Sequence, residues 1–129
     1  MRKLLATLLV LSLVLPVIAL AEPATKGTIV IGVYEPASGD NGAGGKQETL
    51  GVRYAHTLQP TVELSDGVYE IKLVEADNQS STDKAPTAAQ DLVSQDAAIV
   101  LGSYGSSVSI AAAPIFDRAG LVAIGLSCT

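Results

Sequence analysis

A glycine-rich run, GDNGAGGKQE at residues 39–48, is the first stretch whose composition suits a small-molecule site. A phosphate-binding loop needs a glycine, four residues and then Gly-Lys-Ser/Thr, so that backbone N–H groups surround the phosphate and the hydroxyl reaches Mg²⁺. Here Asp40 stands where the first glycine is required, and Gln47 replaces the hydroxyl residue after Lys46. Gln47 also replaces the third glycine of the dinucleotide fingerprint. The run therefore does not predict nucleotide binding, and a mobile loop with positive φ angles is the simpler alternative.

A second polar cluster, LGSYGSS at residues 101–107, joins an apolar stretch to a helical pattern. Unpaired N–H groups and the dipole at a helix N-terminus favour an anion such as a carboxylate, and Ser106 adds a hydroxyl donor. Gly105 and Ser107 contribute bare backbone and a second hydroxyl. The alternative is that these serines only cap the helix.

Catalysis finds little support in the same residues. A serine nucleophile needs a base, and the one histidine, His56, belongs to another segment, where we interpret it as a solvated helix position. Residues 102–105 also lack the G-x-S-x-G spacing of a nucleophile elbow. Asp77 and Asn78 are better explained by turn and cap chemistry. The sequence contains no acid pair or metal-ligand cluster, so we predict no enzyme, metal or cofactor.

The first 21 residues predict a cleaved signal peptide and a periplasmic location. Two cations precede an apolar run that ends in Ala19-Leu20-Ala21, the small residues that a signal peptidase requires. A retained anchor is the alternative, but the run is short for a membrane span and contains Pro16. The following residues, 22–129, carry thirteen acidic and six basic side chains, a net charge of −7 that argues against nucleic acid. Cys128 is the only cysteine, so no disulfide forms within the chain.

Hydrophobic periodicity predicts alternating strands and helices. Expected strands cover residues 28–34, 68–77 (after an Asp66-Gly67 turn), 97–101 and 121–125. Expected helices cover the end of the glycine run to about 59, 83–93 and 106–118. The first helix should bury its stripe of Leu50, Tyr54 and Leu58, the second should start at an Asp83 cap with Pro86 in its third position, and Pro114 should kink the third. Phe116 is the lone phenylalanine, so we expect a core of Ala, Val, Ile and Leu.

The order βαβαβαβ predicts an α/β fold with a doubly wound parallel sheet and helices on both faces. Ligands of such sheets bind beyond the carboxyl ends of the strands. Three loops reach that edge, at residues 38–45, 101–107 and 126–129. The last strand should present an unpaired edge.

In combination, IGVYEPASGDNGAGG, GVRYA, KLVEADNQS, VLGSYGSSVSIAAAPIF and AIGLSCT resemble the amino-terminal lobe of type I periplasmic binding proteins. The resemblance spans residues 28–129 and is greatest to the branched-chain amino acid and amide-binding proteins of ABC importers. It implies that Ser106 and neighbouring amides hold a ligand α-carboxylate, with Thr129 beside them and the Ser127 carbonyl facing the α-ammonium. Gly44 stands where the family often has an aromatic residue, and Tyr104 is a candidate to supply that ring.

The resemblance implies a solute-binding component that delivers an amino acid or small amide to ABC permease subunits, as a monomer when full length. Residues 22–129 would be an incomplete amino-terminal lobe, and without a second lobe we expect weak or no binding of leucine-like ligands. The alternatives are the ligand-binding sensor domain of a membrane receptor and, as an outsider, a secreted α/β hydrolase.

Overall fold

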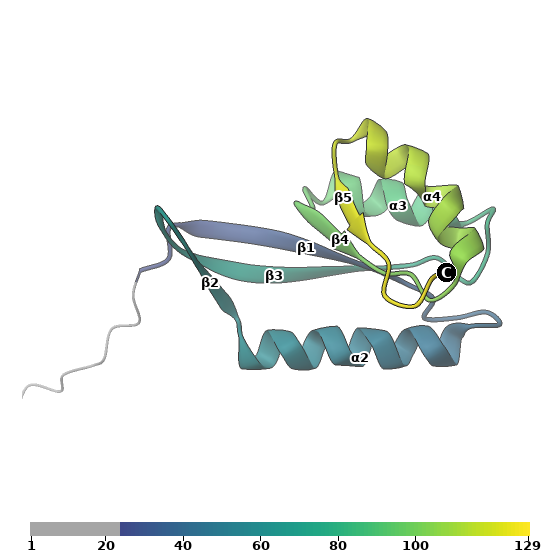
Figure 1. Cartoon of the computed structure of the whole chain (residues 1–129), viewed down its shortest axis with the longest axis horizontal. Coiled ribbons are helices and arrows are strands. Elements are labelled where there is room, and N and C mark those ends of the chain that lie inside the picture. Colours follow the sequence, from purple (N-terminus) through teal and green to yellow (C-terminus); the bar gives the residue numbers. More distant parts are fainter. Residues whose placement is uncertain (1–23) are drawn as a thin grey trace, which may run out of the picture.

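The computed structural model describes residues 24–129, so the predicted signal peptide lies outside the described residues. Along this part of the chain the element order comprises five strands and three helices, which Figure 1 labels. Their bounds are β1 (Gly27–Glu35), α2 (Gly42–Leu58), β2 (Thr61–Leu64), β3 (Gly67–Asp77), α3 (Ala85–Ser94), β4 (Ile99–Leu101), α4 (Ser106–Arg118) and β5 (Val122–Ile124).

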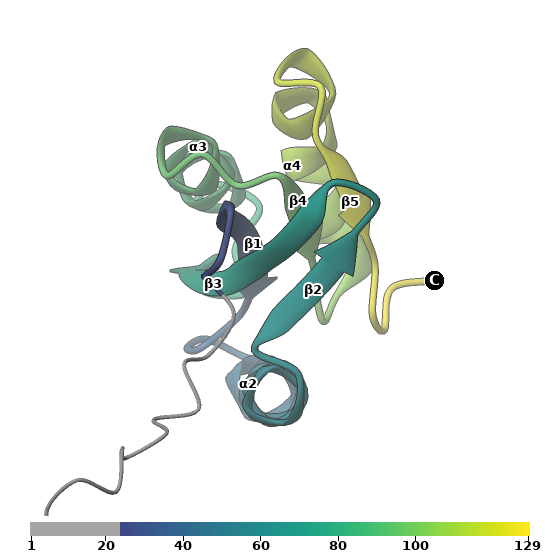
Figure 2. The ribbon, with the colours of Figure 1, turned by 90° about the vertical axis from the view of Figure 1, so that its left-hand side faces the viewer.

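The strands form one sheet in the order β2-β3-β1-β4-β5. β1 pairs in parallel with β3 on one side and β4 on the other, and β4 pairs in parallel with β5. One helix, α2, lies on one face of the sheet, and α3 and α4 lie on the other (Figure 2). The predicted doubly wound α/β fold is therefore confirmed.

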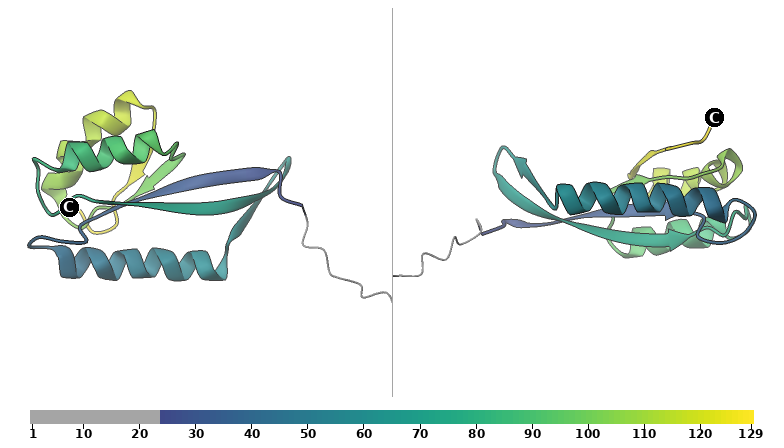
Figure 3. Two further views of the ribbon diagram at one scale, coloured as in Figure 1. Left: turned by 180° about the vertical axis from the view of Figure 1, so that it is seen from behind. Right: turned by 90° about the horizontal axis from the view of Figure 1, so that it is seen from below.

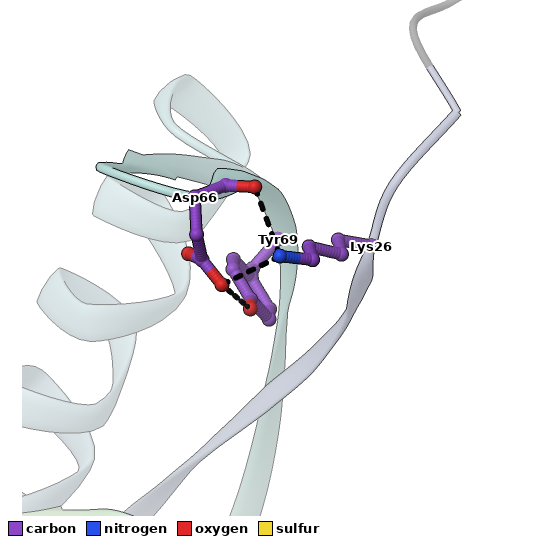
Figure 4. Close-up of polar contacts among 3 residues, drawn as sticks. All are labelled: Lys26, Asp66 and Tyr69. Carbon is purple, nitrogen blue, oxygen red and sulfur yellow. Dashed lines mark hydrogen bonds and ion pairs between the residues drawn. The ribbon is translucent and has the colours of Figure 1, made fainter.

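The element that the sequence did not predict is β2, which pairs antiparallel with β3. It is a four-residue edge strand, too short for periodicity to separate it from a loop. The turn that closes this hairpin is Ser65-Asp66, one residue earlier than the expected Asp66-Gly67, because Gly67 already pairs with Leu64. Lys26, just before β1, donates a 2.7 Å hydrogen bond to the Asp66 carboxylate, and the Tyr69 hydroxyl donates another at 2.9 Å (Figure 4). These contacts, although exposed, fasten the hairpin tip to the start of β1.

The hydrophobic core lies between the sheet and the pair α3 and α4. Strand side chains alternate between faces, so Tyr34, Val74 and Ala76 meet the inward faces of these two helices. Leu92 of α3 is fully buried among them. The expectation of a purely aliphatic core is wrong, because Phe116 packs edge-to-face on Tyr34 with ring centroids 5.5 Å apart.

Helix α2 does not bury the stripe predicted from its periodicity. Leu50, Tyr54 and Leu58 are 53%, 67% and 66% exposed. Helix α2 runs along the sheet beside β1, as the view from below shows (Figure 3), and His56, which lies off the stripe, contacts the Ile71 carbonyl of β3. Two grooves of about 490 and 450 Å³ separate helix and sheet. Periodicity predicted the helix correctly, but it did not predict which side of the helix faces the sheet.

Several predicted boundaries also change. α2 starts at Gly42, inside the run expected to be a loop, and of the run's four glycines only Gly39 has a positive φ, of 76°. α3 starts at Ala85 without a side-chain cap, so the Asp83 cap is wrong and Pro86 is the second helical residue. β5 lies at the edge of the sheet, as expected for the last strand, and all three of its apolar residues are exposed. No helix within residues 24–129 has the length and apolarity to cross a membrane.

Candidate functional site

The loops that follow β1, β4 and β5 meet at the carboxyl edge of the sheet, as the order of parallel strands predicts. The contact that joins two of them is made by Ser106, the first residue of α4. Its Oγ accepts a 3.0 Å hydrogen bond from the Thr129 backbone N–H and lies 3.4 Å from Thr129 Oγ1. Two predicted ligand-binding residues, 23 positions apart in the chain, are therefore in direct contact.

The N-terminus of α4 is left without a side-chain cap. Gly105 occupies the cap position with φ 126° and ψ 123°, and no side chain bonds to the first helical amides. The alternative that the serines serve only as caps is therefore wrong. Because Ser106 Oγ accepts from the Thr129 N–H, its own hydrogen can be donated to Thr129 Oγ1 or to a bound acceptor. Ser107, the next residue, is exposed. The arrangement suits an anion with at least two acceptor oxygens.

Tyr104 occupies the space that a side chain at position 44 would fill. A Cβ built on Gly44 would lie 2.7 Å from two carbons of the Tyr104 ring. The ring thus crosses from the loop after β4 to the first turn of α2, and it is 39% exposed. The Tyr104 ring therefore lies next to Gly44, and its role as the aromatic surface of a ligand site stays a prediction.

Asp77 and Asn78 build the edge rather than face a ligand. The Asp77 carboxylate accepts hydrogen bonds from the backbone N–H groups of Ala37 and Gln79, both at 2.8 Å, and from Ser38 Oγ at 2.7 Å. Burial favours a higher pKa for Asp77, but these donors together lower it below the ordinary value. Asn78 is fully buried and donates to Ser103 Oγ at 2.9 Å. The predicted turn chemistry describes both residues.

Replacing Asp77 with alanine should lower the free energy of unfolding by about 2 kcal/mol, because a charged group that accepts four hydrogen bonds is lost. Urea denaturation of wild type and variant measures this difference. The matched control is Asp83→Ala, an exposed aspartate in the turn before α3, which should change stability by less than about 0.5 kcal/mol. Equal stabilities of the two variants would contradict the role assigned to Asp77.

His56 lies on α2 and is half-buried, so its interpretation as a solvated position is wrong. Its Nε2 lies 2.8 Å from the Ile71 carbonyl oxygen of β3, a contact that ties helix to sheet. Within residues 24–129, no cluster of three or more His, Cys, Asp or Glu side chains is arranged to hold a metal ion.

Two residues that the sequence analysis did not identify, Glu35 and Glu48, contact the loops that carry the candidate site. Glu35, the last residue of β1, is 3% exposed, and its Oε2 accepts a 2.7 Å hydrogen bond from the Tyr104 backbone N–H. Glu48 of α2 contacts the Ser127 hydroxyl. A carboxylate at the end of an apolar strand was the available signal for Glu35, because buried charges require partners.

A family model described as periplasmic binding protein matches residues 28–129. The chain belongs to the periplasmic binding protein family. An amino acid binding protein of Pseudomonas aeruginosa is 37% identical to this family member over 99 residues, which are 74% of the chain and 26% of the relative.

Two solved periplasmic binding proteins share its fold. One is the branched-chain amino acid transporter substrate-binding protein LivJ of Streptococcus pneumoniae, in complex with isoleucine, with 30% identity, a TM-score of 0.70, and coverage of 79% of this chain and 29% of LivJ. The other is the leucine binding protein LivK of Thermotoga maritima, with 26% identity, a TM-score of 0.70, and coverage of 78% and 28%. The chain thus spans between a quarter and a third of the length of these relatives. The family consists of substrate-binding proteins of transporters, which are not enzymes and which act outside the cytoplasm.

Proposed function

We propose that this protein is the solute-binding component of an ABC importer and that it binds an amino acid with a branched side chain, or a small amide, at the carboxyl edge of the sheet. The observation that carries the proposal is the convergence of Ser106 and Thr129 at the uncapped N-terminus of α4. The identity of 30% to an isoleucine-bound protein supports this class of ligand.

In this proposal the ligand carboxylate lies against the first amides of α4, where the helix dipole and the unpaired N–H groups compensate its charge. The Ser106 hydroxyl, held in place by the Thr129 amide, donates to one carboxylate oxygen, and Thr129 Oγ1 reaches the same region. The Ser127 backbone carbonyl accepts from the ammonium group, and the Tyr104 ring covers part of the side chain. All of these contacts use uncharged donors and acceptors, so they hold a zwitterion without promoting a reaction.

The partners that follow from the proposal are the permease subunits of the importer, which take the ligand from the loaded protein. Residues 22–129 then belong to the amino-terminal ligand-binding lobe, and residues 1–21 direct export to the periplasm. The proposed protein works as a monomer and performs no catalysis.

Ser106→Ala in the full-length protein should weaken binding of leucine, isoleucine or valine about 10- to 100-fold, because a hydrogen bond to a charged group contributes about 1.5–3 kcal/mol. Isothermal titration calorimetry measures the change. The control is Ser109→Ala: this hydroxyl, one turn later in α4, donates to the Gly105 carbonyl and should matter little for affinity.

Unchanged affinity in Ser106→Ala would contradict the proposed carboxylate site. Ester hydrolysis by the wild-type protein that disappears in the variant would instead identify Ser106 as a nucleophile.

A further inference from the structure

Two carboxyl groups near the proposed site, those of the buried Glu35 and the half-buried Glu48, each have a buried oxygen that accepts no hydrogen bond. Glu35 Oε2 accepts from the Tyr104 N–H, but Glu35 Oε1 has no hydrogen-bond donor among the described residues. Glu48 Oε1 contacts the Ser127 hydroxyl, while Glu48 Oε2 is also buried without a donor. Tyr104 lies near both residues: its N–H donates to Glu35, and its ring lies against Gly44, one turn before Glu48 on α2. Hydrogen bonding to Glu48 also contributes to the raised pKa of Glu35, as expected for neighbouring carboxyl groups. In each carboxyl group, therefore, one oxygen contacts a loop of the candidate site and the other oxygen accepts no hydrogen bond.

Two neighbouring carboxylates repel each other when both are ionised. In addition, each buried oxygen that accepts no hydrogen bond destabilises the folded state. One proton placed between the groups removes both costs, because it turns one acid into a donor for the other.

No other described group supplies that donor. The Arg53 guanidinium on α2 is engaged by Glu75 of β3 at 2.6 Å, and the Asp77 carboxylate of β3 is engaged by backbone amides. The Tyr34 hydroxyl points to the opposite face, toward the Val108 carbonyl at 3.1 Å. Lys46 of α2 lines the same groove as Glu35 but makes no hydrogen bond to it.

We propose that Glu35 and Glu48 share one proton and that this acid pair is a clamp that fixes the loop carrying Tyr104 relative to the loop carrying Ser127. Both residues are positioning residues: they act on Ser106 and Thr129 through the loops that hold them. The effect on ligand affinity rests on the proposed function, but the clamp itself does not.

The direction of the pH dependence follows from the environment of Glu35. Burial, aided by Glu48 and opposed by the Tyr104 amide, raises the pKa of Glu35 to about 8. The folded protein therefore holds the proton more tightly than the unfolded chain, in which the carboxyl ionises near its ordinary value of 4.5. The contribution of the clamp to stability is complete below about pH 4.5 and is lost as the pH rises through about 8.

The direct test is an NMR titration of the ¹⁵N-labelled full-length protein without ligand, from about pH 6 to pH 10. The backbone amide signals of Tyr104 and Thr129 should shift together with a common midpoint near pH 8. In Glu35→Gln the carboxamide oxygen still accepts from Tyr104 and its NH₂ group donates to Glu48, so the signals should keep their low-pH positions throughout. The matched control is Glu63→Gln, an exposed carboxyl on β2, which should titrate like wild type.

Ligand affinity gives the second readout. Wild-type affinity for leucine should fall about tenfold from pH 7 to pH 9, whereas that of Glu35→Gln should stay constant. The absence of a shared amide transition in wild type, or its persistence in Glu35→Gln, would overturn the clamp. A shared transition with constant wild-type affinity would overturn its role in positioning the site. A shared transition in a protein that binds no amino acid at any pH would support the clamp and refute the proposed function.

Discussion

Gly45→Ala should lower the free energy of unfolding by about 3 kcal/mol, the upper end of the usual cost of overpacking. In an ordinary helix this substitution stabilises, since alanine has the higher helix propensity by about 1 kcal/mol. At Gly45 the backbone of α2 passes directly against Pro36, and an added Cβ would collide with the Pro36 carbonyl oxygen and lie 2.6 Å from two of its ring carbons. Because a backbone oxygen cannot rotate away, the start of α2 and the loop after β1 must separate.

The matched control is Gly51→Ala, two turns later in the same helix. A Cβ at Gly51 meets nothing within 4 Å, so this variant should gain about 0.5–1 kcal/mol from propensity alone. Chemical denaturation of the two variants therefore tests the sign as well as the size of the effect. A stabilised Gly45→Ala would show that α2 does not approach Pro36 in this way.

Phe116→Ala should destabilise the protein by about 3–5 kcal/mol, because a large ring is removed from a packed core. Phe116 of α4 is 4% exposed and packs at an interplanar angle of 88° on Tyr34 of β1. The Tyr34 hydroxyl in turn donates to the Val108 carbonyl of α4. The cavity would therefore loosen the contact between α4 and the sheet, and with it the position of Ser106.

Tyr54→Ala is the control for Phe116→Ala, since it removes an aromatic ring from the exposed side of α2. It should change stability by less than about 0.5 kcal/mol. Thermal or urea denaturation followed by circular dichroism measures both variants. Comparable losses of stability in the two variants would mean that α2 buries Tyr54, and would contradict the packing of α2 on the sheet described above.

Local patterns predicted the elements best where one signal marked each end. The strand β3 and the helix α4 were predicted within one residue of their observed bounds, because turn residues precede β3 and a glycine precedes α4. The predicted strand at 97–101 is shorter in the structure, since only Ile99–Leu101 pair with β1 and β5. β2 was not predicted because its residues are held in a strand by pairing with β3, and the local sequence does not determine that pairing.

The order of strands and helices also predicted which edge of the sheet carries the candidate site, because the carboxyl ends of parallel strands lie at the same edge. The roles of individual side chains at that edge were harder to anticipate. Contact between Ser106 and Thr129 depends on the distance between two loops, and the approach of Tyr104 to Gly44 depends on the path of a third. The binding roles of all these residues are still predictions.

Strand and helix periodicity, the small residues before the third helix and the order of elements were enough to establish an α/β sheet with loops gathered at one edge. Those features depend on neighbours within a few positions of the chain, whose steric and hydrogen-bonding preferences act in any context. Only the tertiary structure decided which face of α2 packs on the sheet. The same is true of the approach of Glu35 to Glu48. Burial and the pairing of charges depend on contacts between distant segments, and no local pattern encodes them.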